Sequence, residues 1–174
     1  MKKIYIIQMQ TKTIPSRIVK LFTGYGYSHV AISFNKNCDY IYSFGRRGLY
    51  SVLFGGFTMQ KKNGRFFKKY KNTKCRVYEV EVSNKQYNDL VKIIKYMKKN
   101  QYDYGYDYLG IVLRFLKIPI TFKKKYVCSY FVAELLKEAK VYEFNKKTCF
   151  VKPKDFENID IFNLIYTGKY LSYK

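Results

Sequence analysis

The sequence predicts an α+β fold in which helices pack on a mostly antiparallel sheet. Three observations predict it. Short apolar segments rich in β-branched residues alternate with polar turns, longer segments carry an apolar stripe at helical spacing, and neither an internal repeat nor a linker interrupts the chain. The chain has 174 residues, of which 48% are hydrophobic, so it can bury a sizeable core. We therefore expect a single domain over residues 1–174.

Five segments are expected to form strands. The first is a short continuous apolar run, and the second is apolar and β-branched, as is typical of a buried strand. The second and third flank the polar turn 35–39, which predicts a hairpin. The fourth alternates apolar and polar residues. The expected strands span residues 3–9, 27–34, 40–44, 74–82 and 162–171.

Helices are expected where apolar residues recur at a helical period. Ser83 and Gln86 form a capping box at the start of one of them. Pro15 suits the first turn of a short helix that Gly24 ends, and Pro119 stops another. The expected helices cover residues 15–22, 84–97, 108–117 and 128–139.

The remaining segments are expected to be irregular. Residues 45–57 hold four glycines, too many for one regular element, and the pair Gly55–Gly56 predicts a turn. Residues 62–72 are expected to form a basic loop or edge segment, residues 101–108 a tyrosine-rich loop, and residues 152–156 a turn.

The formal net charge of +22 would attract nucleic acid, anionic lipid or acidic wall polymers. Codon bias is the competing explanation, because Lys, Tyr, Asn, Ile and Phe all have A/T-rich codons and Trp is absent. If a partner selected the charge, lysines should gather near the cleft, and Lys123–Lys125 suggests that place. Even scatter would indicate composition alone.

The cysteines argue against a metal or disulfide framework. Cys38, Cys75, Cys128 and Cys149 are widely spaced, and with His29 as the single histidine no metal-ligand spacing occurs. The N-terminus lacks a small-residue cleavage site and is expected to be a first strand rather than a signal peptide. No segment approaches the length of a membrane span. We expect a cytoplasmic protein with reduced thiols, no metal and no cofactor.

His29 and Cys128 are the residues with catalytic potential. Cys128 opens a predicted helix, where unpaired backbone N–H groups and the helix dipole stabilise a thiolate and bind an oxyanion. These effects predict a lowered pKa for the thiol. His29 lies on a predicted strand and could act as general base and acid. The alternative for Cys128 is a small buried residue on the apolar stripe of the helix, without a catalytic role. The alternative for His29 is a structural histidine whose ring is hydrogen-bonded within the strand.

The order of these motifs resembles the circularly permuted papain-like cysteine hydrolases of the NlpC type, including the YiiX/YycO-like group. In that branch a strand reading roughly HVGI supplies the histidine, and a later helix reading roughly YCSELV supplies the cysteine. The matching segments here are His29–Ile32 and Tyr126–Val132. Tyr102–Asp103 matches the family's Tyr-Asp stretch before the nucleophile helix. The resemblance implies a permuted papain-like fold with Cys128 as nucleophile.

Further site residues follow from position. Pairing across the turn puts residue 43 or 44 opposite His29, so Ser43 is the expected orienter of the imidazole ring. Tyr126 and Tyr102 are candidate substrate contacts, and Tyr104 or Tyr106 could take that role or donate to an oxyanion. Arg46 could bind a carboxylate or phosphate at the cleft rim, although a solvated loop residue is the plainer alternative.

The expected function is attack of Cys128 on an amide or ester carbonyl, with an acyl-enzyme that is hydrolysed or transferred. The resemblance implies a small peptide, muropeptide or lipid-like acyl substrate. Two other classes stay open. One is a catalytically degenerate member of the fold. The other is a basic protein that binds nucleic acid or an anionic membrane surface, with nucleic acid the less expected partner.

Overall fold

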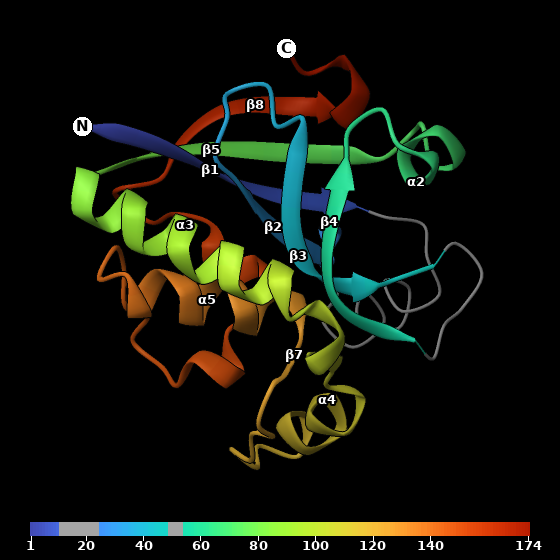
Figure 1. The fold of residues 1–174 in the computed structure, drawn as a ribbon, viewed down its shortest axis with the longest axis vertical. Helices are drawn as coiled ribbons and strands as arrows, with labels where there is room; N and C mark the ends of the chain where they lie inside the picture. The colour runs from blue at the N-terminus through green and yellow to red at the C-terminus, as the bar shows by residue number, and fades with distance from the viewer. Residues whose placement is uncertain (11–24, 49–53) are drawn as a thin grey trace.

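The computed structural model describes residues 1–10, 25–48 and 54–174, and it confirms the α+β class. Within these residues one sheet has eight strands in the order β7-β6-β4-β3-β2-β1-β5-β8, and it is mostly antiparallel (Figure 1). The strands are β1 (Lys2–Gln10), β2 (His29–Ser33), β3 (Tyr40–Arg46), β4 (Gly55–Lys61), β5 (Lys74–Val82), β6 (Gly105–Tyr106), β7 (Lys125–Tyr126) and β8 (Asn163–Lys169). Only β6 and β7 are paired in parallel among the described pairs.

Strand β1 lies at the centre of the sheet between β2 and β5. Its residues from Ile4 to Met9 are buried on both faces, which explains the continuous apolar run in its sequence. Ile4 and Ile6 belong to the core beneath the helices, whereas Tyr5 and Ile7 belong to a second core on the opposite face. The alternation along a strand therefore divides one apolar run between two cores.

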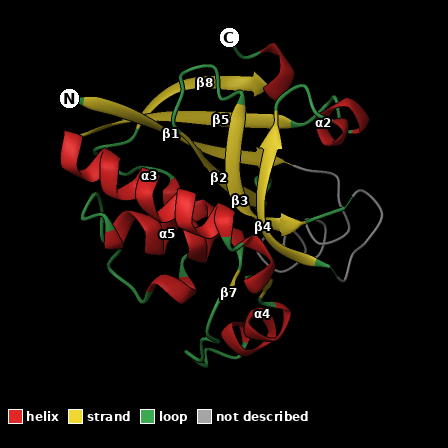
Figure 2. Cartoon of the chain, in the orientation of Figure 1, coloured by secondary structure: helices red, strands yellow, loops and turns green. Residues whose placement is uncertain are grey.

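Helices α3 (Asn84–Lys99) and α5 (Cys128–Glu138) cover one face of the sheet side by side (Figure 2). The predicted capping box of α3 is confirmed. The Ser83 hydroxyl accepts from the Gln86 N–H at 3.1 Å, and the Gln86 side chain accepts from the Ser83 N–H at 2.8 Å. Apolar residues of both helices pack into the core that holds Ile4 and Ile6.

Two segments differ from the sequence-based expectation. Helix α2 (Arg65–Lys69) forms inside the expected basic loop, because Phe67 is fully buried in the second core. Gly55–Gly56 does not form a turn but begins β4, where Gly56 pairs with Gly45 of β3 and Gly105 of β6. A Cβ on Gly56 would clash with the Tyr104 carbonyl oxygen and the Arg47 side chain, so glycine permits this close approach.

The expected hairpin of residues 27–44 is confirmed as β2–β3, and the expected strands at residues 3–9, 74–82 and 162–171 are confirmed as β1, β5 and β8. Short 3-10 turns, η1 (Gln101–Asp103), η2 (Thr148–Phe150), η3 (Pro153–Phe156) and η4 (Tyr170–Ser172), occupy connecting segments. The short helix expected after Pro15 lies outside the described residues. Among the residues that the structure describes, no helix is both long and apolar enough to cross a bilayer.

Helix α4 (Tyr108–Phe115) forms where residues 108–117 predicted a helix. It projects from the lower end of the molecule, away from the pair α3 and α5 (Figure 1). The short strands β6 and β7 connect this region to the sheet, and β7 leads directly into α5. The connection places the tyrosine-rich loop beside the start of α5.

Candidate active site at the start of helix α5

Cys128 is the first residue of α5, as the sequence predicts. The residue before it, Val127, makes no side-chain cap, and the first helical hydrogen bond runs from the Phe131 N–H to the Val127 carbonyl at 2.9 Å. The amide groups of the first turn therefore have no partner within the helix. They are available to the side chain of Cys128, a residue that is 6% exposed.

Three backbone N–H groups act on the Cys128 sulfur: those of Val30, Ser129 and Cys128 itself. Each lowers the pKa of the thiol, because hydrogen bonds to sulfur favour the thiolate. Burial has the larger effect, and the net pKa of Cys128 is raised above its ordinary value. The expectation of a lowered pKa is therefore wrong for the resting site, since the sequence revealed the helix start but not the depth of burial.

The N–H of Val30 is available because β2 and β3 separate at this point. Their register consists of the single pair Ile32 and Tyr42. Beyond it, the Val30 carbonyl accepts a hydrogen bond from the Ser43 hydroxyl at 2.6 Å, and the Val30 N–H acts on the Cys128 sulfur. Two side chains thus interact with the backbone groups of Val30, which places Cys128 beside β2.

Burial lowers the pKa of His29 to about 4. The ring is therefore a neutral imidazole at neutral pH, and its low pKa makes it a weaker base than an ordinary imidazole. Alternation puts the His29 side chain on the face of Ala31, whereas α5 covers the face of Val30. The His29 Cε1 atom lies 3.6 Å from the position that a Cβ on Gly45 would take. The absence of a side chain at Gly45 makes room for the ring.

Ser43 occupies a different position from the one expected. The observed pair Ile32 and Tyr42, continued along both strands, places Gly45 rather than residue 43 or 44 opposite His29. The hydroxyl of Ser43 donates its only proton to the Val30 carbonyl. Ser43 therefore holds the backbone of β2 in place beside Cys128, and it does not donate to the imidazole ring in this structure.

Tyr106 is the tyrosine that the fold brings to Cys128. Burial raises the pKa of Tyr106 well above its ordinary value, and the nearby Cys128 thiol is the next cause. The phenol therefore stays protonated and is a hydrogen-bond donor at this site. The sequence contains two Tyr-Asp pairs in the loop, and Tyr102–Asp103 was the expected one. The structure distinguishes the second pair, Tyr106–Asp107, by its position at the start of α4. There the Asp107 carboxylate accepts a hydrogen bond from the Gly110 N–H at 3.0 Å and caps the helix.

The structure gives the other two expected substrate contacts, Tyr102 and Tyr126, different surroundings. Tyr102 is 82% exposed and lies under the Arg47 guanidinium, 5.5 Å from the ring centroid. Tyr126 packs on Tyr130 and Phe44 with centroid separations of 4.9 and 5.0 Å, so it is part of the core. These contacts give Tyr102 and Tyr126 structural partners.

Arg46 remains close to a possible ligand site. It donates to the Tyr70 hydroxyl at 3.5 Å, and its charge lowers the pKa of Tyr108 against the larger raising effect of burial. Tyr108 lines a pocket of about 220 Å³. The pocket lining comprises Tyr106, Asp107, Tyr108, Leu109, Phe122 and Lys125. Tyr106, whose pKa the Cys128 thiol raises, also lines this pocket.

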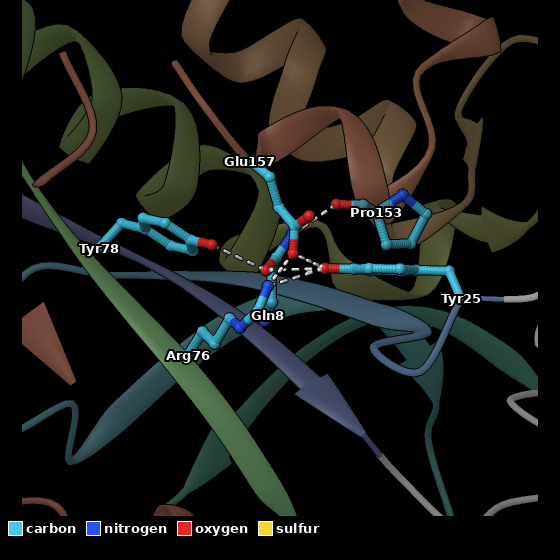
Figure 3. Close-up of polar contacts among 6 residues, drawn as sticks. All are labelled: Gln8, Tyr25, Arg76, Tyr78, Pro153 and Glu157. Carbon is cyan, nitrogen blue, oxygen red and sulfur yellow. Dashed lines mark hydrogen bonds and ion pairs between the residues drawn. The ribbon is translucent and has the colours of Figure 1, made fainter. Parts of the chain in front are cut away.

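A polar network holds the segment that contains Pro153 and Glu157 against the sheet (Figure 3). Gln8, which is opposite Val30 in the β1–β2 register, donates to the Pro153 carbonyl at 2.6 Å and accepts from the Tyr78 hydroxyl at 3.1 Å. The Ser129 hydroxyl donates to the Val151 carbonyl at 2.6 Å. The segment 151–157 is thus bonded both to β1 and to the residue after Cys128.

An ion pair between Glu157 and Arg76 holds the C-terminal end of this segment. The Glu157 carboxylate accepts from the Arg76 guanidinium of β5 and from the Tyr25 hydroxyl (Figure 3). The Arg76 guanidinium also lies 4.7 Å from the Tyr27 ring centroid. These bonds join residues that are far apart in the sequence, and they fix the position of α5 relative to Val30.

All four cysteines are free thiols. Burial raises the pKa of Cys38 and of Cys75 to about 12, so these two are poor nucleophiles. Within the described ranges, no three His, Cys, Asp or Glu side chains gather into a group that could hold a metal ion.

The titration of His29 is directly measurable, because the chain has one histidine. We expect one imidazole signal in the NMR spectrum with a pKa of about 4 in the folded protein. The unfolded chain takes up this proton near pH 6.5, so the folded state should lose about 3 kcal/mol of stability as the pH falls from 6.5 to 4. A His29→Gln variant should lack this part of the pH dependence. An imidazole that titrates near 6.5 would contradict the burial.

The structure thus places Cys128 at the start of α5 beside the backbone of β2, with Tyr106 near enough for the thiol to raise its pKa. The His29 ring lies on the other face of β2. Cys128 and His29 were expected at the site, whereas Tyr106 was one of several tyrosines considered. No protein-family model matches the chain, and no match is found among curated proteins.

Proposed function

We propose that this protein is a cysteine-nucleophile hydrolase or acyltransferase with a permuted papain-like arrangement. The observation that carries the proposal is the action of the Val30 N–H on the Cys128 sulfur, because Val30 directly follows the only histidine. A backbone N–H points within the plane of a sheet, so the sulfur lies at the edge of β2. The His29 ring lies on the other face of the same strand, so the proposed proton transfer takes place across this edge.

In the proposed reaction, neutral His29 takes the thiol proton as the Cys128 sulfur attacks the carbonyl carbon of an amide or ester. The carbonyl oxygen becomes an oxyanion, which the first-turn N–H groups of α5 and the Tyr106 hydroxyl stabilise. The bond to the leaving amine or alcohol then breaks, and His29 returns the proton to that group. Water or another acceptor attacks the thioester and releases the acyl product.

The site chemistry favours an acyl substrate with an apolar or aromatic part and a negative charge. Aromatic and aliphatic side chains form most of the pocket lining, and Lys125 is its cation. Arg46 acts on Tyr108 at the same pocket. A lipid-like acyl compound fits this lining better than a highly polar muropeptide. The free thiols fit a reducing, cytoplasmic setting.

Trapping the acyl-enzyme tests this proposal. We expect intact-mass spectrometry of protein mixed with p-nitrophenyl octanoate to show one added acyl group, located on Cys128 by peptide mapping. Cys128→Ser should abolish the adduct. Cys149→Ser is the matched control, because Cys149 is a free thiol with similar exposure, 5% against 6%. Acylation spread over several cysteines, or absent with both this ester and a peptide p-nitroanilide, would contradict the proposal.

A further inference from the structure

Helix α4 presents its apolar stripe to solvent. Leu109, Val112, Phe115 and Leu116 are 58%, 57%, 63% and 61% exposed. Their spacing places them on one side of the helix. Ile118 and Ile120 extend the exposed apolar surface along the next segment, at 36% and 46%. We call residues 109, 112, 115, 116, 118 and 120 the α4 surface. Surface helices of globular proteins usually bury such a stripe.

A buried ion pair fixes this orientation. The Asp107 carboxylate, 1% exposed, accepts two hydrogen bonds from the Arg114 guanidinium, 9% exposed, at 2.5 and 3.0 Å. Gly110 lies on the same inner side, where a Cβ would clash with both groups. The inner side of α4 is therefore the polar one. The pair also buries the Asp107 carboxylate on the inner side, so the α4 surface carries no carboxylate.

The charges around the α4 surface are positive. The segment from Tyr108 to Tyr126 contains no Asp or Glu. Lys117 lies within the exposed segment, and Lys123 and Lys125 follow it, all three exposed. A projecting apolar surface with a cationic border is typical of elements that lie in the interface of an anionic bilayer.

The same element leads to the candidate active site. Tyr108 and Leu109 of α4 and Phe122 of the next segment line a pocket together with Tyr106, whose pKa the Cys128 thiol raises. A compound that leaves a bilayer at the α4 surface would therefore meet the pocket without crossing bulk water.

We propose that the α4 surface inserts into the interfacial layer of an anionic lipid membrane, and that the substrate is an acyl compound carried in that membrane. The bilayer takes up the exposed apolar side chains, and its headgroups neutralise Lys117 and Lys123. Membrane binding requires only the α4 surface. The identity of the substrate rests on the proposed hydrolase or acyltransferase activity.

The first test is binding to vesicles of phosphatidylglycerol and phosphatidylcholine in equal parts. We expect sedimentation with these vesicles, weaker binding as salt increases, and little binding to pure phosphatidylcholine. The variant Val112→Gln/Leu116→Gln should bind at least about tenfold more weakly. The matched control is Ile161→Gln/Leu164→Gln, which changes two apolar residues that are 45% and 49% exposed elsewhere.

The charge can be tested in the same way. Lys117→Glu/Lys123→Glu should weaken binding about tenfold or more. Lys95→Glu/Lys98→Glu, which alters two exposed lysines of α3 and changes the net charge equally, should have a smaller effect. Equal loss in both variants would mean that only net charge acts, and it would overturn the assignment to the α4 surface.

The absence of tryptophan provides a local probe. A Leu116→Trp variant should show a blue-shifted emission on mixing with the anionic vesicles, whereas Tyr96→Trp, at a position 60% exposed on α3, should not. No shift at residue 116 would overturn insertion. So would a stable dimer in light scattering that Val112→Gln/Leu116→Gln dissociates, because a second copy would then cover this surface. Cys128→Ser should bind vesicles as the wild type does, which separates this test from that of catalysis.

Discussion

Replacing Arg114 with alanine is expected to lower the free energy of unfolding by about 3–5 kcal/mol, because it leaves the buried Asp107 carboxylate without its cation. The carboxylate would keep only the Gly110 N–H as a hydrogen-bond donor among its described contacts. Urea unfolding monitored by tyrosine fluorescence measures the change. Helix α4 should also lose protection from hydrogen exchange.

A double variant shows whether the loss of stability comes from leaving Asp107 unpaired or from losing the Asp107–Arg114 ion pair itself. Asp107→Asn/Arg114→Met keeps an N-cap side chain and removes both charges, so it should recover most of the stability. Lys85→Ala is the control, because it breaks an ion pair with Asp89 in which the two side chains are 84% and 41% exposed. That variant should leave the urea midpoint nearly unchanged. A wild-type midpoint for Arg114→Ala would contradict the buried pair.

Removing the imidazole of His29 is expected to slow acylation of Cys128 by p-nitrophenyl octanoate about 10²- to 10⁴-fold near neutral pH. Burial raises the pKa of Cys128, so the thiol needs a base to lose its proton there. Stopped-flow release of p-nitrophenol from His29→Ala measures the effect. At high pH the difference from the wild type should shrink, because hydroxide then removes the proton. Added imidazole should partly restore the rate in the variant.

Ser43→Ala tests whether Ser43 acts as the third catalytic residue by orienting the His29 ring. Its hydroxyl is bonded to the Val30 carbonyl, so we expect a modest change in rate and a loss of about 1–3 kcal/mol in stability. If Ser43→Ala slows acylation as much as His29→Ala does, Ser43 orients the ring during the reaction. If neither variant changes the rate, His29 is not the base, and the proposed mechanism is wrong.

Local patterns predicted most of the secondary structure, because each depends on neighbouring residues. The capping box of Ser83 and Gln86, the alternation of β5 and the apolar stripe of α5 gave their elements correctly. Strand β4 and helix α2 were missed. The glycines of β4 resemble a turn until Gly105 is placed beside Gly56, and α2 depends on the burial of Phe67 beneath β1 and β5.

The sequence by itself determined that the chain is an α+β protein, that Cys128 begins a helix and that His29 lies on a strand. These features follow from the apolar period, the glycines and the prolines. Only the tertiary structure decided what surrounds them. The separation of β2 and β3 released the Val30 N–H, burial set the protonation of His29 and Cys128, and the Asp107–Arg114 pair turned the apolar side of α4 outward. Burial and desolvation depend on contacts between distant residues, and no local pattern contains them.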